Sequence, residues 1–140
     1  MIERILHKIG RIREYINLID SIKDECTARF TSDPLYRGAL LHYLYLLADS
    51  CIALSELVIK YKKLRLPQTY YEAFDILGEN KILEPGFAFS FAKIAGFRNF
   101  LDHDYEKIAE SSICKVALSK LEDVEEFLRQ IEDSLGINKI

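Results

Sequence analysis

Apolar residues at helical spacing run through the first 25 residues and constrain the fold more than any other feature of the chain. They recur mostly at steps of three and four residues, as Ile2, Ile5, Leu6, Ile9, Ile12, Ile16, Ile19 and Ile22. This spacing places them on one face of an α-helix, with the charged residues between them on a solvated face. We therefore expect a long amphipathic helix over residues 2–25, followed by a connector over residues 27–33.

Two pairs of residues mark the starts of further helices. Asp33 can cap free backbone N–H groups and Pro34 suits a first helical turn, so we expect a second helix from there to about Leu64. Apolar residues cover this segment on several sides, which predicts a central helix or one that lends a side to a partner subunit. Thr69 and Glu72 have the spacing of a capping box and predict a short third helix.

The C-terminal part of the chain carries two more helical segments. Residues 87–100 are rich in phenylalanine and predict a fourth helix, whose aromatic side chains we expect in the core and in a dimer contact. Gly78 and residues 84–86, Glu-Pro-Gly, bracket a connector before it. Residues 108–135 predict the last helix, with Gly136 as its C-terminal stop. The fold class is therefore all-α, a helical bundle of about five helices in a single domain over residues 1–140.

Composition excludes several classes of protein. Apolar residues make up 49% of the chain and charged residues 29%, which is typical of a globular domain and not of a disordered chain. No apolar run is long enough to span a bilayer, and the first residues lack the layout of an export signal. We expect a cytoplasmic protein without membrane contact.

The three cysteines show no closely spaced pair. Cys26, Cys51 and Cys114 are scattered, and an odd count in a cytoplasmic chain favours buried thiols over a disulfide framework. Zinc sites usually contain ligands in short pairs. We therefore expect no metal site and no cofactor.

The formal net charge of −3 does not attract nucleic acid over a distance, so any RNA contact must come from a local basic patch. One candidate is the run Lys60, Lys62, Lys63 and Arg65. The alternative, which we favour, is a set of cations that complements the partial negative charge at a helix C-terminus.

Residues 98–105, Arg-Asn-Phe-Leu-Asp-His-Asp-Tyr, hold most of the residues suited to phosphate chemistry. In RNA the neighbouring 2′-hydroxyl is the nucleophile, so cleavage needs a base, an acid and a cation. His103 can serve as base or acid because an unperturbed imidazole titrates near neutral pH. Arg98 offers a fork of donors that suits two phosphate oxygens. Asn99 can donate a further hydrogen bond to phosphate or fix the tautomer of His103.

Helix geometry limits how Arg98 and His103 can meet. On an unbroken α-helix they are about 140° apart, so they would not face one phosphate. Either the helix ends near Leu101 and the chain turns His103 back, or a symmetric dimer brings the two residues together from both subunits. The polar run from Asp102 to Asp104 favours a local break.

A polar stripe interrupts the otherwise apolar second helix. His42, Asp49 and Glu56 share a helical face with Tyr45. These side chains either orient Arg98 or His103 from behind, or form a partly exposed edge of the bundle.

The string Arg98-Asn99-x-x-x-His103-x-Tyr105 resembles the catalytic motif of the HEPN superfamily, and its final tyrosine resembles the HepT-like branch. The resemblance extends over residues 30–131. It includes the Asp-Pro helix start, Asp49 within the long helix, and residues 67–70, Pro-Gln-Thr-Tyr, before the third helix.

This resemblance implies an up-and-down helical homodimer that acts as the toxin of a type II toxin–antitoxin pair. It also implies a metal-independent endoribonuclease, acting on tRNA or mRNA, with Arg98 and His103 as the catalytic pair and Asn99 and Asp49 in support. An MntA-like nucleotidyltransferase antitoxin would silence it by adding AMP to Tyr105. Asp102 departs from the family pattern, in which an apolar residue is commoner before the histidine. A carboxylate there either favours protonated His103 or weakens RNA binding.

Two alternatives remain at the level of the sequence. The bundle can be a non-catalytic RNA-binding or protein-interaction module held by a nucleotidyltransferase. It can also be a dimeric scaffold with no nucleic-acid role.

Overall fold

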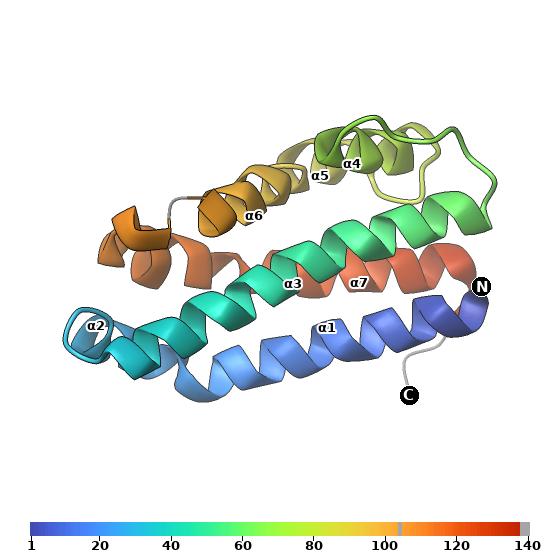
Figure 1. Cartoon of the computed structure of the whole chain (residues 1–140). Helices are drawn as coiled ribbons and strands as arrows, with labels where there is room; N and C mark the ends of the chain where they lie inside the picture. Colours follow the sequence, from blue (N-terminus) through green and yellow to red (C-terminus); the bar gives the residue numbers. More distant parts are fainter. Residues whose placement is uncertain (104, 138–140) are drawn as a thin grey trace.

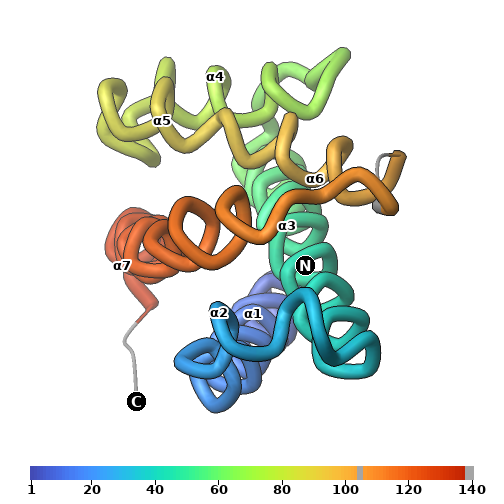
Figure 2. Tube along the Cα trace, turned by 90° about the vertical axis from the view of Figure 1, so that its left-hand side faces the viewer, coloured from blue at the N-terminus to red at the C-terminus, as the bar shows by residue number. Residues whose placement is uncertain are grey.

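The computed structural model describes residues 1–103 and 105–137, and all regular structure in these residues is helical. The main helices are α1 (Ile2–Ile22), α3 (Pro34–Tyr61), α4 (Tyr70–Glu79), α5 (Pro85–Phe91), α6 (Ile94–His103) and α7 (Leu121–Leu135). Helices α1, α3 and α7 run lengthwise, and α4, α5 and α6 follow one another along one side (Figure 1). The end-on view places α3 between α1 and the layer of α4 to α6, with α7 beside it (Figure 2). The predicted all-α class is confirmed.

The stripe in the first helix forms the core as predicted. Ile5, Ile12 and Ile19 have no exposed surface, and Ile9 and Ile16 are almost fully buried. Leu6, which was assigned to the same stripe, is exposed. The helix ends at Ile22 and passes into a 3-10 turn, η1 (Lys23–Glu25), so its predicted length is correct to within a few residues.

Helix α3 is the central helix. It buries residues on several sides, among them Leu40, Leu44, Leu54 and Val58. By length and composition it is apolar enough to cross a membrane, contrary to the expectation from the sequence, but 56% of that window is buried inside the structure. The apolar character of α3 is therefore used by the core of the bundle.

Both ends of α3 have local causes. Asp33 accepts a hydrogen bond from the backbone N–H of Tyr36 (3.1 Å), which caps the helix as predicted. The helix ends at Tyr61 and not at the predicted Leu64. Lys63 adopts a left-handed backbone conformation (φ +57°) that an α-helix cannot include.

The capping box before α4 is present. The Thr69 hydroxyl accepts from the N–H of Glu72 (3.1 Å), and Glu72 in turn accepts from the N–H of Gln68 (2.9 Å). Reciprocal bonds of this kind satisfy backbone donors that a helix start leaves free.

The predicted fourth helix is two helices, and Glu84 and Pro85, at the end of the predicted connector, start the first of them. The Glu84 carboxylate accepts from the N–H groups of Gly86 (2.9 Å) and Phe87 (2.7 Å), and these bonds hold its pKa below the usual range. A turn at Ala92 and Lys93 then separates α5 from α6. This change of direction lets Phe91 of α5 stack on Phe127 of α7 while α6 packs on α3.

The predicted last helix is also interrupted. Residues 105–120 form short turns, η2 (Tyr105–Lys107), the π-helical η3 (Ser112–Val116) and the 3-10 turn η4 (Ala117–Lys120), and regular α-helix begins only at Leu121. These irregular turns bury both Ile108 and Ile113. In a continuous α-helix the fixed helical period would set the directions of the two side chains. Gly136 ends α7 in a left-handed conformation (φ +69°), as predicted.

The expectation of three free thiols is wrong. Cys26 and Cys114 form a disulfide, with Cα atoms 5.6 Å apart and a sequence separation of 88. Cys26 begins a short helix, α2 (Cys26–Arg29), inside the predicted connector, and Cys114 lies in η3. Both segments lie at the same end of the bundle (Figure 1), which spacing along the chain does not reveal. Cys51 is a buried thiol as expected, and burial raises its pKa.

Candidate active site

Arg98 of α6 is held against α3 by two side chains of the polar stripe. Its Nε donates to Asp49 Oδ1 (3.1 Å) and its Nη2 donates to the Tyr45 hydroxyl (2.9 Å). Tyr45 and Asp49 are four residues apart, so they project from one face of α3 toward the same partner. Two residues of this stripe, Tyr45 and Asp49, therefore contact Arg98 directly, and their role in orienting it stays a prediction.

Aromatic rings flank the same guanidinium. Its central carbon lies 5.2 Å from the centre of the Tyr45 ring and 5.3 Å from that of Tyr70, distances typical of cation–π contacts. The side chain of Arg98 is only 16% exposed. Burial acts to lower its pKa, but the hydrogen bond to Asp49 and the nearby phenol groups outweigh burial, and the pKa of Arg98 lies above its ordinary value. Arg98 therefore stays charged at any working pH.

Arg98 and His103 both lie near the carboxylate of Asp102. One oxygen of its carboxylate, Oδ2, lies 3.6 Å from Arg98 Nη1 and 3.6 Å from His103 Nε2. The two nitrogen atoms are thus separated by no more than twice that distance. A phosphate group that accepts hydrogen bonds of about 2.8 Å through different oxygens can span such a gap. The side chain of His103 is 73% exposed and accessible to a large substrate.

The expected break near Leu101 is wrong, because α6 continues through His103. Asp102 follows Arg98 by four residues, and an ion pair at this spacing stabilises a helical turn. Arg98 and His103 therefore both lie within 3.6 Å of one carboxylate oxygen, although their positions on the helix are about 140° apart. The second arrangement considered from the sequence, a shared cleft in a dimer, stays a prediction.

The other predicted site residues have different surroundings. The side-chain oxygen of Asn99 accepts from Arg98 Nη1 (3.2 Å), so Asn99 contacts the guanidinium and its proposed role at phosphate or at His103 stays a prediction. Tyr105 begins η2, but its side chain lies outside the described part of the structure, as does Asp104. The expected modification of Tyr105 also stays a prediction.

The basic run lies at the C-terminal end of α3. Arg65 pairs with Glu72 (3.1 Å) and Glu79 (2.9 Å), which reduces the positive charge available to a ligand. Lys60, Lys62 and Lys63 are exposed beside the helix end. Their role in RNA binding stays a prediction.

The sequence interpretation missed one partner of Arg98. Tyr70 was noted only as part of the resemblance, and no periodicity links it to α6. Its place at the start of α4, directly after the Thr69 cap, was the available signal. In the rest of the polar stripe, His42 is exposed with its ring beside Tyr43, and Glu56 is partly buried, which is compatible with the alternative of a partly exposed edge of the bundle.

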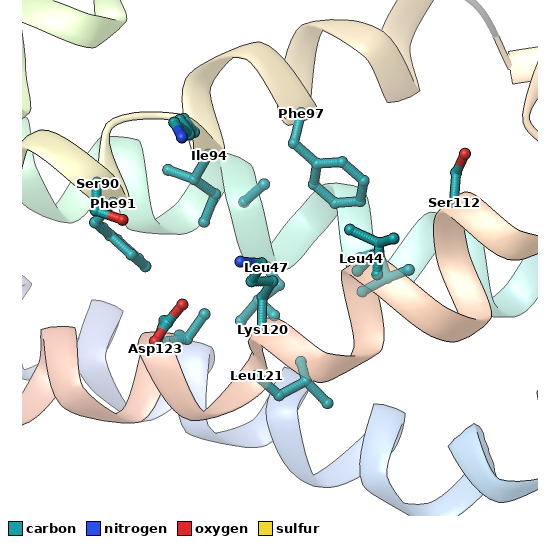
Figure 3. A pocket seen from close by; sticks show the side chains of 15 residues that line it. Leu44, Leu47, Ser90, Phe91, Ile94, Phe97, Ser112, Lys120, Leu121 and Asp123 are labelled. Carbon is teal, nitrogen blue, oxygen red and sulfur yellow. The ribbon is translucent and has the colours of Figure 1, made fainter.

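A cavity of about 410 Å³ lies on another side of α6, between α3, α5 and the start of α7 (Figure 3). Phe97 and Ile94 point into it from α6, opposite Leu44 and Leu47 of α3 and Leu121 of α7 (Figure 3). None of the predicted site residues lines it. We therefore place the candidate active site at Arg98 and His103 and not in this apolar cavity.

The helical bundle and its surface Arg98–His103 motif define a HEPN-type protein. The chain belongs to the ribonuclease HepT-like family, whose model matches residues 5–131. It is 24% identical over 128 residues to the mRNA nuclease HepT of Shewanella oneidensis, covering 91% of this chain and 96% of that protein. It is 26% identical over 136 residues to the tRNA nuclease HepT of Aphanizomenon flos-aquae, covering 96% and 90%.

The fold has a solved counterpart. The structure resembles that of the tri-AMPylated HEPN toxin of Shewanella oneidensis in complex with MNT antitoxin, with a TM-score of 0.82 and 24% identity. The likeness covers 92% of this chain and 96% of that one. The family resemblance stated from the sequence is confirmed.

Proposed function

We propose that this protein is the toxin of a type II toxin–antitoxin pair and acts as a metal-independent endoribonuclease on mRNA or tRNA. Family membership and the two nuclease relatives support the activity. The observation that carries the assignment of the site is the shared approach of Arg98 and His103 to one carboxylate oxygen. A scissile phosphate bound between the guanidinium and the imidazole could receive charge stabilisation from the first and proton transfer from the second.

The reaction is an internal transfer at phosphorus. The 2′-oxygen of RNA bonds to phosphorus as its proton passes to a base, and the bond from phosphorus to the 5′-oxygen breaks as that oxygen receives a proton. His103 serves as base or acid, while Arg98 stabilises the charge that builds on the phosphate oxygens. The products are a 2′,3′-cyclic phosphate and a 5′-hydroxyl. Asp49 and Tyr45 keep the guanidinium oriented during the reaction.

The chemistry favours a homodimer. Proton transfer needs both a base and an acid, and the motif supplies one imidazole per subunit. A second copy of the chain would supply the other imidazole within a shared cleft. Light scattering coupled to size-exclusion chromatography tests this part of the proposal, and a mass of one chain at working concentration would contradict it.

The proposed antitoxin is an MntA-like nucleotidyltransferase. It would transfer AMP from ATP to the hydroxyl of Tyr105 with release of pyrophosphate. Each added AMP brings negative charge two residues from His103, in competition with RNA phosphate. The solved relative, an AMPylated toxin with an antitoxin, supports this partner. We also propose a cytoplasmic location, where such RNA substrates are found.

The deciding experiment is cleavage of cellular RNA by purified, unmodified protein in the presence of a chelator. We expect cleavage by the parent and a loss of roughly a hundredfold or more for Arg98→Ala and for His103→Ala. Arg129→Ala and His7→Ala are matched controls, because both residues are exposed on other helices and should leave the rate unchanged. RNA retention without cleavage by the parent would favour the non-catalytic module instead.

A further inference from the structure

Asp102 occupies the place between the two groups assigned to the scissile phosphate. Its Oδ2 atom faces Arg98 Nη1 and His103 Nε2 at the same distance, 3.6 Å. A carboxylate oxygen and a phosphate oxygen are both anionic acceptors of similar size, and both suit an arginine fork and an imidazolium. The same two nitrogen atoms therefore cannot serve the carboxylate and an RNA phosphate at once.

The contacts of Asp102 differ from those of the other carboxylate on Arg98. Asp49 receives a directed hydrogen bond from Nε at 3.1 Å, on the side of the guanidinium that faces α3. Asp102 lies 3.6 Å from each partner, beyond the range of a strong hydrogen bond. The two carboxylates are about equally exposed, 45% for Asp49 and 43% for Asp102, so the contrast between them lies in these distances. Asp49 is thus placed to orient Arg98, whereas Asp102 can rotate into solvent at low cost.

We propose that Asp102 is an internal competitor of the RNA phosphate, which holds Arg98 and His103 together in the free protein and leaves when RNA binds. This inference rests on the proposed ribonuclease function. Asp102 therefore affects the affinity for RNA. Removal of its charge leaves the phosphate position free, whereas the groups that perform the reaction remain. Asp102 thus tunes substrate binding in this chain. It lies inside the motif but takes no part in the reaction itself.

A purely structural role for Asp102 predicts the opposite result. If its ion pairs mainly hold the last turn of α6 or position His103, removal of the charge must weaken cleavage. If Asp102 competes with phosphate, removal must tighten binding. The sign of the change therefore separates the two roles, and a gain of affinity does not follow from local unfolding.

The test compares the parent with Asp102→Asn, with an RNA that carries 2′-O-methyl groups as a non-cleavable ligand. We expect the Kd for this RNA, and the KM for cleavable RNA, to fall by about threefold to tenfold, with kcat changed by less than about threefold. Glu106→Gln is the matched control, since it removes one exposed negative charge near the motif, and within the described part of the chain no ion pair joins Glu106 to Arg98 or His103. Asp102→Ser serves as a second variant should the amide disturb folding, which circular dichroism reports.

An unchanged or raised Kd in both Asp102 variants, with cleavage by the parent intact, overturns this inference and leaves the proposed function standing. An equal gain in Glu106→Gln also overturns it, because the effect would then be one of overall charge. A parent protein that neither binds nor cleaves RNA overturns the proposed function and this inference together.

Discussion

At the scale of single residues, the chemistry of this protein depends on how one guanidinium is surrounded. Arg98 donates one hydrogen bond each to Asp49, Tyr45 and Asn99, and aromatic rings flank it. Three of these partners come from outside α6, so its orientation is fixed by the packing of α3 and α4. An arginine restrained in this way loses little conformational entropy when it binds phosphate.

Tyr70 provides a test of this restraint. We expect Tyr70→Leu to lower kcat/KM by about threefold to tenfold, because it removes a cation–π contact that is partly shielded from water. Tyr70→Phe keeps the ring and should remain within about twofold of the parent. The measurement is steady-state cleavage of a short RNA, and equal losses in both variants would show that the hydroxyl group matters and not the ring.

At the scale of elements, the start of α5 and the turn between α5 and α6 decide where the site residues lie. Glu84 and Pro85 start α5 abruptly, and the turn at Ala92 and Lys93 redirects the chain into α6. The close packing of α4 on α5 stabilises the start of α5. At Gly78 of α4 a Cβ atom would come within 2.9 Å of the Ala88 side chain, so only a glycine permits this approach.

Two glycine substitutions should therefore have opposite effects on stability. Gly78→Ala forces a methyl group into the contact between α4 and α5 and should lower the free energy of unfolding by about 1–3 kcal/mol. Gly10→Ala lies on the exposed side of α1 with no heavy atom near its Cβ, and should raise it by about 0.5–1 kcal/mol. Urea unfolding monitored by circular dichroism measures both. A Gly78→Ala protein as stable as the parent would contradict the packing of α4 on α5.

At the scale of the whole molecule, a covalent link joins segments that are remote in sequence. The Cys26–Cys114 disulfide ties the turn after α1 to the irregular segment that follows the motif. A separation of 88 residues means that the link restricts the unfolded chain considerably. Reduction opens this link, so the oxidised and reduced forms of this protein should differ in stability.

Removal of the disulfide should cost about 2–5 kcal/mol of stability. We expect Cys114→Ser to unfold at a lower temperature than the oxidised parent and to be insensitive to dithiothreitol. The parent treated with dithiothreitol should move toward the variant. Thiol titration of the denatured, unreduced parent should find Cys51 alone. Three titratable thiols would contradict the link.

The sequence by itself determined the features that depend on neighbours a few residues apart. Backbone hydrogen bonds and helical periodicity are local, so the features that depend on them could be predicted from the sequence. They are the stripe from Ile5 to Ile19, the caps at Asp33 and Thr69, the stop at Gly136 and the motif from Arg98 to His103. Only the tertiary structure decided the pairing of Cys26 with Cys114, the division of residues 87–100 into two helices, and the contact of Tyr70 with Arg98. These features depend on which helix faces meet across the bundle. Burial of apolar surface is not directional, so it can favour many arrangements of the same helices, and a local sequence pattern does not distinguish between them.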